Sequence, residues 1–331
     1  MKDSLRPHIL MVAEMPPVAA FDERFTVHRL WQLPDPAAFY AQFGKQIVGI
    51  AGGPKSPIDA GLMDRLPGLE IIASFGAGYE KVDVAAARQR GIVVTTTPDV
   101  LTEEVADTAI GLLISSVRQF PQAEKYLREG RWAASGKRFP LTPNSLRGRH
   151  VGIVGLGRIG KAIARRCQAM ALEVSYWGRS KQADIPYRYY PSLIELATDA
   201  DTLIVALPGG RETASLVSAD VIAALGSNGV FVNIGRGSVV DEPALVRALR
   251  EGRLAAAGLD VFMNEPSPSA ELLALENVVL LPHIGSVSQA TWQCMAQLVF
   301  DNLKSWFDGE GPITPLRQTV ASGHRPRLPT P

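Results

Sequence analysis

The stretch Val151–Gly160, which reads VGIVGLGRIG, decides the fold. Its first four residues, 151–154, form an apolar run typical of a buried parallel strand. Gly155, Gly157 and Gly160 follow with the spacing G-x-G-x-x-G, and helical periodicity begins directly after them. Strand, glycine turn and helix in this order direct backbone N–H groups and the positive end of a helix dipole at one point. This arrangement favours a bound diphosphate, and therefore a dinucleotide.

The three glycines have separate roles in such a turn. Gly155 allows the tight turn, Gly157 lets the backbone approach a pyrophosphate, and Gly160 lets helix and strand pack closely. The alternative is a glycine-rich turn without a ligand, but the flanking strand and helix favour the dinucleotide. We assign the whole turn to the cofactor: Gly155, Leu156, Gly157, Arg158, Ile159 and Gly160.

The composition is that of an ordinary globular protein. The chain has 331 residues, of which 46% are hydrophobic and 20% charged, and this suits two domains with real cores. The formal net charge of +1 disfavours a nucleic-acid partner. The apolar segment His8–Ala13 is too short for a signal sequence or a membrane span. Cys167 and Cys294 have no metal-binding spacing and form no disulfide framework, so we expect a soluble cytoplasmic protein without a metal site.

Short strands alternate with helices along the chain, which predicts an α/β fold with parallel sheets. A helix beginning at Thr102 is long enough to connect two domains, and the stretch 130–146 is expected to be a boundary loop or an arm against a second subunit. We expect the end of the chain, 322–331, to be disordered. The predicted strands are 9–12, 25–30, 47–50, 70–74, 92–94, 151–154, 173–177, 202–207, 230–234, 254–259 and 278–281, and the predicted helices include 36–43, 58–66, 102–117 and 287–306.

The end of the strand Glu173–Trp177 indicates the type of dinucleotide. An acid at this place would bind the ribose 2′-hydroxyl of NAD, but none is present. Arg179, Ser180 and Lys181 follow instead, and a guanidinium grips a 2′-phosphate well. We therefore predict NADP(H) as the preferred cofactor and NAD(H) as the alternative. The other interpretation is a basic, solvated surface turn that binds no cofactor.

Polar side chains follow three later strands of the predicted sheet. Arg236, Asp260 and His283 each come directly after a strand. Ligands of open α/β sheets bind beyond the carboxyl ends of the strands, so we expect these three residues on one rim.

The loop Phe75–Tyr79, which reads FGAGY, also follows a strand. The free N–H groups of Ala77 and Gly78 are able to hold a carboxylate there. A plain strand-to-helix turn accounts for the loop equally well.

His283 is the histidine best placed for chemistry, and Glu265 is its candidate partner. A carboxylate on one imidazole nitrogen fixes the tautomer and favours the protonated form, which is the better acid. Arg236 lies between two glycines, and its guanidinium suits a substrate carboxylate and carbonyl, although a surface arginine is the bland alternative. His8, His28, His150 and His324 lie at strand edges or in the tail, where packed or solvated roles are expected.

These motifs closely resemble those of the D-isomer-specific 2-hydroxyacid dehydrogenases, and among them the NADPH-dependent glyoxylate/hydroxypyruvate and hydroxyphenylpyruvate reductases. The resemblance runs from about Ile71 to Ser286. The motifs that carry it are the glycine turn of 155–160, 233–237 (NIGRG), 258–262 (GLDVF), 265–266 (EP) and 282–286 (PHIGS).

The resemblance implies a catalytic triad of Arg236, Glu265 and His283. It also implies that the backbone of Ala77 and Gly78 binds the substrate carboxylate, together with Arg236 and His283. The cofactor would be lined by Thr108, Leu207, Pro208, Ile234, Arg236, Asp260, His283 and Gly285, in addition to the glycine turn and the basic turn 179–181.

The resemblance further implies a Rossmann cofactor domain inserted into a flavodoxin-like substrate domain, both doubly wound, in a homodimer built through the cofactor domain. We expect a substrate domain at 1–100, the dinucleotide-binding domain at 101–286, a closing substrate-domain helix at 287–317 and a tail at 318–331.

The implied reaction is hydride transfer from NADPH to the carbonyl carbon of a small 2-oxo acid, with His283 donating the proton and Glu265 supporting its charge. The product would be a D-2-hydroxy acid. Open alternatives are a phosphoglycerate or D-lactate type of dehydrogenase and a non-enzymatic NAD(P)H-sensing corepressor; formate oxidation is disfavoured, because that branch has Gln where Glu265 stands. The preferred 2-oxo acid, whether glyoxylate, hydroxypyruvate or an aryl pyruvate, stays open.

Overall fold

A computed structural model describes residues 6–53 and 57–319. The chain divides into two compact units: unit 1 comprises Met1–Leu101 and Ser288–Pro331, and unit 2 comprises Thr102–Val287. Unit 2 is therefore inserted in the sequence between the two segments of unit 1. The predicted boundaries, after residues 100 and 286, each lie one residue before those of the structure.

The sheet of unit 1 has five strands in the order β2-β1-β3-β4-β5, and every neighbouring pair is parallel. This is the flavodoxin-like order, so the predicted class of this unit is confirmed. The strands are β1 (His8–Met11), β2 (Thr26–Arg29), β3 (Ile47–Gly52), β4 (Ile71–Ser74) and β5 (Val93–Thr95).

Helices cover both faces of this sheet, as a doubly wound fold requires. One face packs under α2, α3 and α4, which contribute Phe39, Met63 and Ala87 to the core. The other face packs under α1 and α13, where Phe21 and Phe300 meet edge to face. The helices are α1 (Ala20–Arg24), α2 (Pro36–Phe43), α3 (Ala60–Asp64), α4 (Val84–Gln89) and α13 (Gln289–Phe307).

The sheet of unit 2 has seven parallel strands in the order β12-β11-β10-β9-β6-β7-β8. From β6, the strands β7 and β8 are added on one side, whereas β9 to β12 are added on the other side. The point between β6 and β9 is therefore the topological switch of a Rossmann fold. The strands are β6 (His150–Val154), β7 (Glu173–Trp177), β8 (Arg188–Tyr190), β9 (Thr202–Val205), β10 (Val230–Asn233), β11 (Ala256–Leu259) and β12 (Val278–Leu280).

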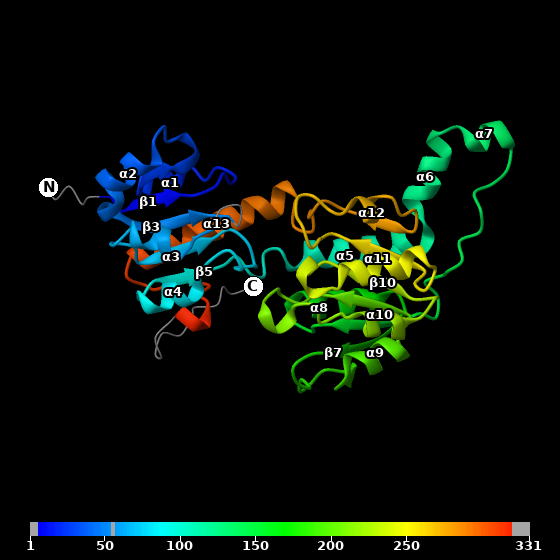
Figure 1. Ribbon diagram of the computed structural model, residues 1–331. Helices are drawn as coiled ribbons and strands as arrows, with labels where there is room; N and C mark the ends of the chain where they lie inside the picture. Colours follow the sequence, from blue (N-terminus) through cyan, green and yellow to red (C-terminus); the bar gives the residue numbers. More distant parts are fainter. Residues whose placement is uncertain (1–5, 54–56, 320–331) are drawn as a thin grey trace. The chain divides into compact units, whose positions relative to one another are not determined.

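Two helix layers enclose this second sheet, which confirms the predicted α/β class (Figure 1). The core cluster of one face joins the strands to α9, α10 and α11, and α5 and α8 pack on the other face. The helices are α5 (Thr102–Arg118), α6 (Phe120–Arg128), α7 (Arg131–Ser135), α8 (Arg158–Ala169), α9 (Leu193–Asp199), α10 (Ala219–Leu225), α11 (Glu242–Arg250) and α12 (Ala270–Leu273).

Side-chain caps set where many of these helices begin. An Asp or Ser at the N-cap accepts a hydrogen bond from a backbone N–H of the first turn, which satisfies one of the donors left open there. The cap shortens the helix predicted at 58–66 to α3, because Asp59 accepts from Leu62 N. The capping residues are Asp35, Asp59, Asp83, Ser192, Ser218, Asp241, Ser269 and Ser288.

The segment after α5 forms an arm, α6–α7, that stands out from the body of unit 2 (Figure 1). The sequence predicted only an irregular stretch over 130–146, whereas α7 occupies its first part and α6 precedes it. α6 was not predicted; its Pro121 lies in the first helical turn, where proline is well tolerated. The long helix α5 begins at the boundary between the units and lies wholly in unit 2.

The packed chain extends further than the sequence predicted at its C-terminal end. Thr319 is buried, and its Oγ1 accepts a hydrogen bond from Val94 N at 3.0 Å, so the tail does not begin at 318. The tail predicted to be disordered, 322–331, lies outside the described residues, as does His324. Among the helices that the structure describes, none is long and apolar enough to cross a membrane.

Candidate active site

The glycine turn lies between β6 and α8, as predicted. Gly155 has φ +100°, and a Cβ there would lie 2.5 Å from Leu207 Cδ2. A Cβ at Gly160 would lie 2.2 Å from the Gly155 carbonyl oxygen, so helix and turn pack too closely for a side chain. A Cβ at Gly157, the exposed N-cap of α8, would meet no described atom within 4 Å. The turn is therefore closed at its base and open at the helix N-terminus, which fits a bound diphosphate.

The basic turn after β7 is tied to the glycine turn. Gln182 Nε2 donates to the Leu156 carbonyl oxygen at 2.8 Å, and Gln182 N donates to Tyr176 Oη at 2.8 Å. Trp177 packs against the core at the end of the strand, where the NAD-specific acid would stand. The three residues that lie between Trp177 and Gln182 and carry the basic or hydroxyl groups are exposed: Arg179, Ser180 and Lys181.

Arg236 lies on a turn that packs against the end of β9. The Asn233 side chain accepts from Gly235 N and donates to the Arg236 carbonyl oxygen, each at 3.0 Å. A Cβ at Gly235 would lie 2.5 Å from the Leu207 carbonyl oxygen, so only glycine permits this approach. The Arg236 guanidinium is half-buried and donates to the Gly235 carbonyl oxygen at 2.7 Å. The turn thus brings Leu207, Pro208 and Ile234 together with Arg236 at the ends of neighbouring strands.

His283 and Glu265 form a direct pair. His283 Nδ1 lies 2.8 Å from Glu265 Oε2, and the two side chains are 46% and 35% exposed. A carboxylate only accepts hydrogen bonds, so the Nδ1 proton lies between the two groups and Nε2 faces away from the glutamate. Glu265 Oε1 accepts from Phe262 N at 3.1 Å, which holds the carboxylate in place. His283 has φ +55°, an uncommon conformation for a residue other than glycine.

Several charges act on the Glu265 carboxyl. Its partial burial raises the pKa, but the hydrogen bonds from His283 and Phe262 N and the positive charge of Arg236 outweigh burial and hold the pKa below its ordinary value. Glu265 is therefore an anion across the neutral range, and its carboxylate accepts the hydrogen bond from His283 Nδ1.

Asp260 orients the loop that carries His283. Its carboxylate is 2% exposed and accepts from Ile284 N at 2.7 Å and from Gly285 N at 2.8 Å. Burial raises the pKa of Asp260, and the two backbone N–H groups partly oppose this rise. A Cβ at Gly285 would lie 2.9 Å from Asp260 Oδ2, so the loop fits the carboxylate closely.

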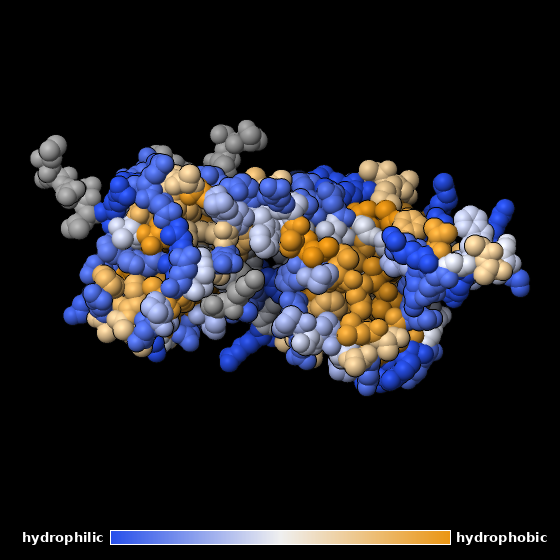
Figure 2. All heavy atoms as spheres, turned by 90° about the horizontal axis from the view of Figure 1, so that it is seen from above, coloured by the Kyte–Doolittle hydropathy of each residue, from blue (hydrophilic) through white to orange (hydrophobic). Residues whose placement is uncertain are grey.

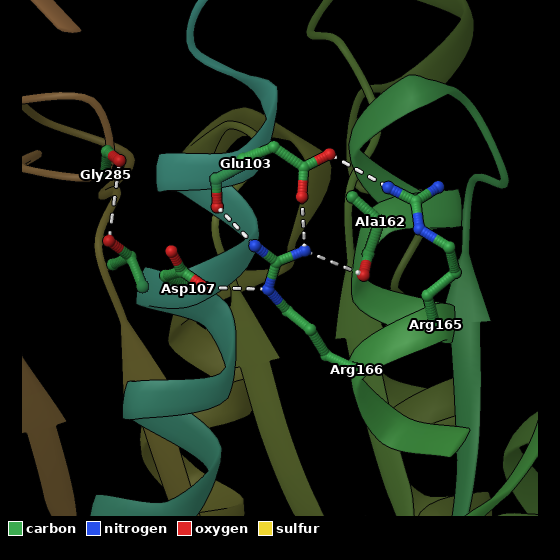
Figure 3. A network of polar contacts seen from close by, with 7 residues as sticks. Glu103, Asp107, Ala162, Arg165, Arg166 and Gly285 are labelled. Carbon is green, nitrogen blue, oxygen red and sulfur yellow. Dashed lines mark hydrogen bonds and ion pairs between the residues drawn. The ribbon is translucent and has the colours of Figure 1, made fainter. Parts of the chain in front are cut away.

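Thr108 reaches the same loop from α5. Its hydroxyl donates to the Gly285 carbonyl oxygen at 3.4 Å, beside the network of Glu103, Asp107 and Arg166 in Figure 3. Unit 2 therefore brings the predicted residues Thr108, Arg236, Asp260, Glu265, His283 and Gly285 to loops that follow its strands and to the adjoining helix α5.

The predicted carboxylate loop belongs to unit 1. Gly76 N donates to Thr97 Oγ1 at 3.0 Å and Thr97 N donates back to the Gly76 carbonyl oxygen at 2.8 Å. The next two residues, Ala77 and Gly78, are exposed and half-buried, and within residues 6–53 and 57–319 no acceptor is recorded for their N–H groups. The loop thus presents two adjacent backbone donors, as an anion site requires.

Sequence reasoning missed three residues that support these groups. They are Thr97, Gln182 and Glu242, and Glu242 Oε2 accepts from Met263 N at 2.8 Å. Each is polar and contacts a loop distant in the sequence, so spacing alone carries no signal for it.

The two cysteines and the other described histidines are not among the residues of this candidate site. His28 Nε2 lies 3.1 Å from His8 Nδ1 on the adjacent strand, and His150 Nε2 lies 2.7 Å from Ser175 Oγ. Burial raises the pKa of the Cys167 thiol to about 12, while Cys294 is exposed.

Comparison with known proteins agrees with this arrangement. The profile of the D-isomer specific 2-hydroxyacid dehydrogenase NAD binding domain matches residues 110–285. Hydroxyphenylpyruvate reductase from Plectranthus scutellarioides is 47% identical over 89% of this chain and 93% of its own length. Glyoxylate/hydroxypyruvate reductase A from Arabidopsis thaliana is 44% identical over the same shares of the two chains.

A solved structure is similar along nearly the whole chain. It is the NADPH-dependent glyoxylate/hydroxypyruvate reductase from Sinorhizobium meliloti in complex with NADP and malonate. That protein is 50% identical, the match covers 95% of this chain and 98% of the other, and the TM-score is 0.89. The inserted Rossmann unit and the paired histidine and glutamate agree with these similarities. The chain therefore belongs to the D-isomer-specific 2-hydroxyacid dehydrogenase family, whose NAD(P)-binding domain it contains.

Proposed function

We propose that this enzyme reduces a small 2-oxo acid of the glyoxylate and hydroxypyruvate class with NADPH and releases the 2-hydroxy acid, in the D configuration where that product is chiral. The single observation that carries the proposal is the His283–Glu265 pair, which offers an oriented proton source on the rim that also bears Arg236. Relatives with this chemistry in their names, at 44–50% identity, support the substrate class.

His283 is the proposed proton donor. Its Nδ1 is held by Glu265, so Nε2 is the nitrogen that points to the substrate carbonyl oxygen and gives up the proton. The ionised Glu265 stabilises the imidazolium before the transfer and keeps the ring in a single orientation. The uncommon backbone conformation at His283, fixed by Asp260, serves this orientation.

Arg236 of unit 2 is proposed to act on the substrate, and the loop of Ala77 and Gly78 in unit 1 is proposed separately as a carboxylate-binding loop. The guanidinium polarises the carbonyl and aligns the carboxylate, so it acts by orientation and electrostatics. The N–H groups of Ala77 and Gly78 bind the carboxylate oxygens.

The residues around the glycine turn fit NADPH. Gly157 leaves room for the pyrophosphate, and Arg179, Ser180 and Lys181 offer two cationic groups and a hydroxyl to the 2′-phosphate. When bound, the cofactor supplies the hydride. Thr108, Leu207, Pro208, Ile234, Asp260 and Gly285 complete the proposed cofactor contacts, and NAD(H) is the weaker alternative.

We also propose a cytoplasmic homodimer that uses the α6–α7 arm. Its large apolar side chains are exposed, with Phe120 at 49%, Leu127 at 57% and Trp132 at 53%, and Figure 2 shows further apolar surface on unit 2. Tyr126 braces the arm internally: its hydroxyl donates to the Lys137 carbonyl oxygen at 2.9 Å. A braced arm with apolar side chains in water is typical of an interface.

The dimer is tested by the variant Trp132→Glu with Leu127→Glu. These charges make burial of the arm costly, so sedimentation equilibrium should show a dimer for the unaltered enzyme and a monomer for the variant. A monomer in both samples would refute the dimer.

The proposed activity is tested by following nicotinamide absorbance with a panel of 2-oxo acids. We expect NADPH oxidation with glyoxylate and hydroxypyruvate and, from hydroxypyruvate, a product that only a D-specific enzyme reoxidises. Preference for pyruvate or a phosphorylated acid would favour another dehydrogenase of the family. Tight NADPH binding without turnover of any acid would favour the corepressor and refute the reductase.

A further inference from the structure

Glu242 is a buried carboxylate that the proposed mechanism does not use. It is 8% exposed and stands at the first position of α11, directly after the N-cap Asp241. Glu242 Oε2 accepts from Met263 N at 2.8 Å. Burial of a carboxylate costs free energy unless the carboxylate has hydrogen-bond partners. The location of Met263 therefore shows which part of the fold this contact stabilises.

Met263 lies in the loop of Glu265. The preceding amide, Phe262 N, donates to Glu265 Oε1 at 3.1 Å, so two carboxylates hold two successive N–H groups of one loop. Glu265 belongs to the loop itself, whereas Glu242 comes from a separate helix. Glu242 is thus an external anchor for the segment that presents Glu265 to His283.

The same helix begins just beyond the turn of Arg236. A Cβ at Gly237 would lie 1.9 Å from the Phe262 carbonyl carbon and 2.3 Å from Met263 N, so the turn and the loop are in direct backbone contact. Glu242 follows five residues later and reaches the peptide that Gly237 touches. Close packing at Gly237 and the hydrogen bond from Met263 therefore join the Arg236 turn to the Glu265 loop at two points.

We propose that Glu242 is a positioning residue for the reaction: by holding Met263 N it keeps Arg236 and Glu265 in the relative placement that the reaction needs. The inference rests on the proposed function, since that function gives the two residues their roles. Because rates depend steeply on placement within about 1 Å, loss of the anchor should lower turnover far more than cofactor binding.

Three substitutions at Glu242 separate hydrogen bonding from charge. Glu242→Gln loses the charge but keeps an oxygen acceptor at the same reach. Glu242→Asp keeps the charge but is one methylene too short for Met263 N, and Glu242→Ala lacks both. Glu251→Ala is the matched control, because Glu251 lies at the other end of α11 and pairs with Arg253.

Three readouts are measured on the full-length enzyme. We expect kcat with glyoxylate to fall about 10- to 100-fold in Glu242→Asp and Glu242→Ala, while Glu242→Gln and Glu251→Ala stay within about threefold. The dissociation constant for NADPH should change less than about twofold in all four. Hydrogen exchange of the peptide that spans 260–266 should accelerate only in Glu242→Asp and Glu242→Ala.

The opposite order of rescue, with Glu242→Asp active and Glu242→Gln inactive, would overturn the inference in favour of a charge effect. Accelerated exchange without loss of kcat would overturn it as well, as would unaltered exchange in Glu242→Ala. If Glu242→Ala does not fold, the Gln and Asp pair decides by the same criteria. An unaltered enzyme that reduces no 2-oxo acid would instead refute the proposed function, and this inference with it.

Discussion

Arg179 carries the proposed choice of cofactor at the scale of a single residue. It is exposed at the end of β7, in a turn that Gln182 fastens to the glycine turn. A hydrogen bond to a charged group contributes about 1.5–3 kcal/mol, so Arg179→Ala should raise KM for NADPH about 10- to 100-fold. KM for NADH should change less than about twofold, because NADH has no 2′-phosphate.

Steady-state kinetics with both cofactors check this prediction. Arg188→Ala is the matched control, since Arg188 is also an exposed arginine of unit 2 but stacks on Tyr190 at the sheet edge. Equal increases of KM for NADPH and NADH in Arg179→Ala would refute the contact with the 2′-phosphate.

Glu265 and Asp260 are predicted to affect stability with opposite dependence on pH. The folded state holds the pKa of Glu265 below its ordinary value of 4.5, so the unfolded chain binds more protons and this group stabilises increasingly as pH rises to 4.5. The contribution is lost as pH falls through the folded pKa. The folded state holds the pKa of Asp260 above 3.8, so that contribution declines as pH rises from 3.8 through the folded pKa.

Thermal unfolding between about pH 3 and about pH 6 measures both effects. The Tm of the unaltered enzyme relative to Glu265→Gln should increase with pH. Its Tm relative to Asp260→Asn should decrease over the same range. Differences that change in the same direction for both variants would contradict the assigned environments.

Local sequence patterns predicted the residues that act through the backbone of their own segment. The glycine spacing of 155–160 determined a turn whose geometry admits only these residues at 155 and 160. His283 and Glu265 were predicted as partners, and their side chains are in contact. Glu242 could not be found in this way, because its partner Met263 is distant in the chain and several other helices also carry an acid in the first turn.

At the scale of elements, a network of charges joins α5 to α8, the helix of the glycine turn (Figure 3). Arg166 pairs with Glu103 at 2.7 Å and with Asp107 at 2.7 Å, and it also donates to the Glu103 and Ala162 carbonyl oxygens. Arg165 has one exposed pair with Glu103 at 2.9 Å. The two neighbours thus differ in burial and in number of partners.

Arg166→Gln should lower the free energy of unfolding by about 1 kcal/mol, since a network of partly buried pairs reaches the upper end of what surface pairs contribute. Arg165→Gln should lower it by less than about 0.5 kcal/mol, because both members of its pair are exposed. Urea unfolding measures both values. Equal losses for the two variants would show that burial and the additional partners of Arg166 add nothing.

At this scale, the predicted strand 173–177 matches β7 at both ends, and the predicted helix 36–43 matches α2 at both ends. α6 was not predicted, although its sequence is amphipathic; none of its residues is buried, so it contributes nothing to the core. Tertiary packing also added β8 at the sheet edge, where three residues are too few to stand out.

At the scale of the whole molecule, two parallel sheets of different strand order share one chain. The order of strands in unit 1 is flavodoxin-like and that in unit 2 is Rossmann-like, so each sheet has its own functional edge beyond the carboxyl ends of its strands. The unit 1 edge presents the N–H groups of Ala77 and Gly78, and the unit 2 edge presents the His283–Glu265 pair.

The central claim is that His283 is the proton donor of an NADPH-dependent 2-oxo acid reductase. The most direct measurement is the rate of NADPH oxidation with saturating glyoxylate for the unaltered enzyme and for His283→Ala. The account predicts a loss of about 10²- to 10⁴-fold in kcat with NADPH binding retained. Unchanged turnover in His283→Ala would contradict it.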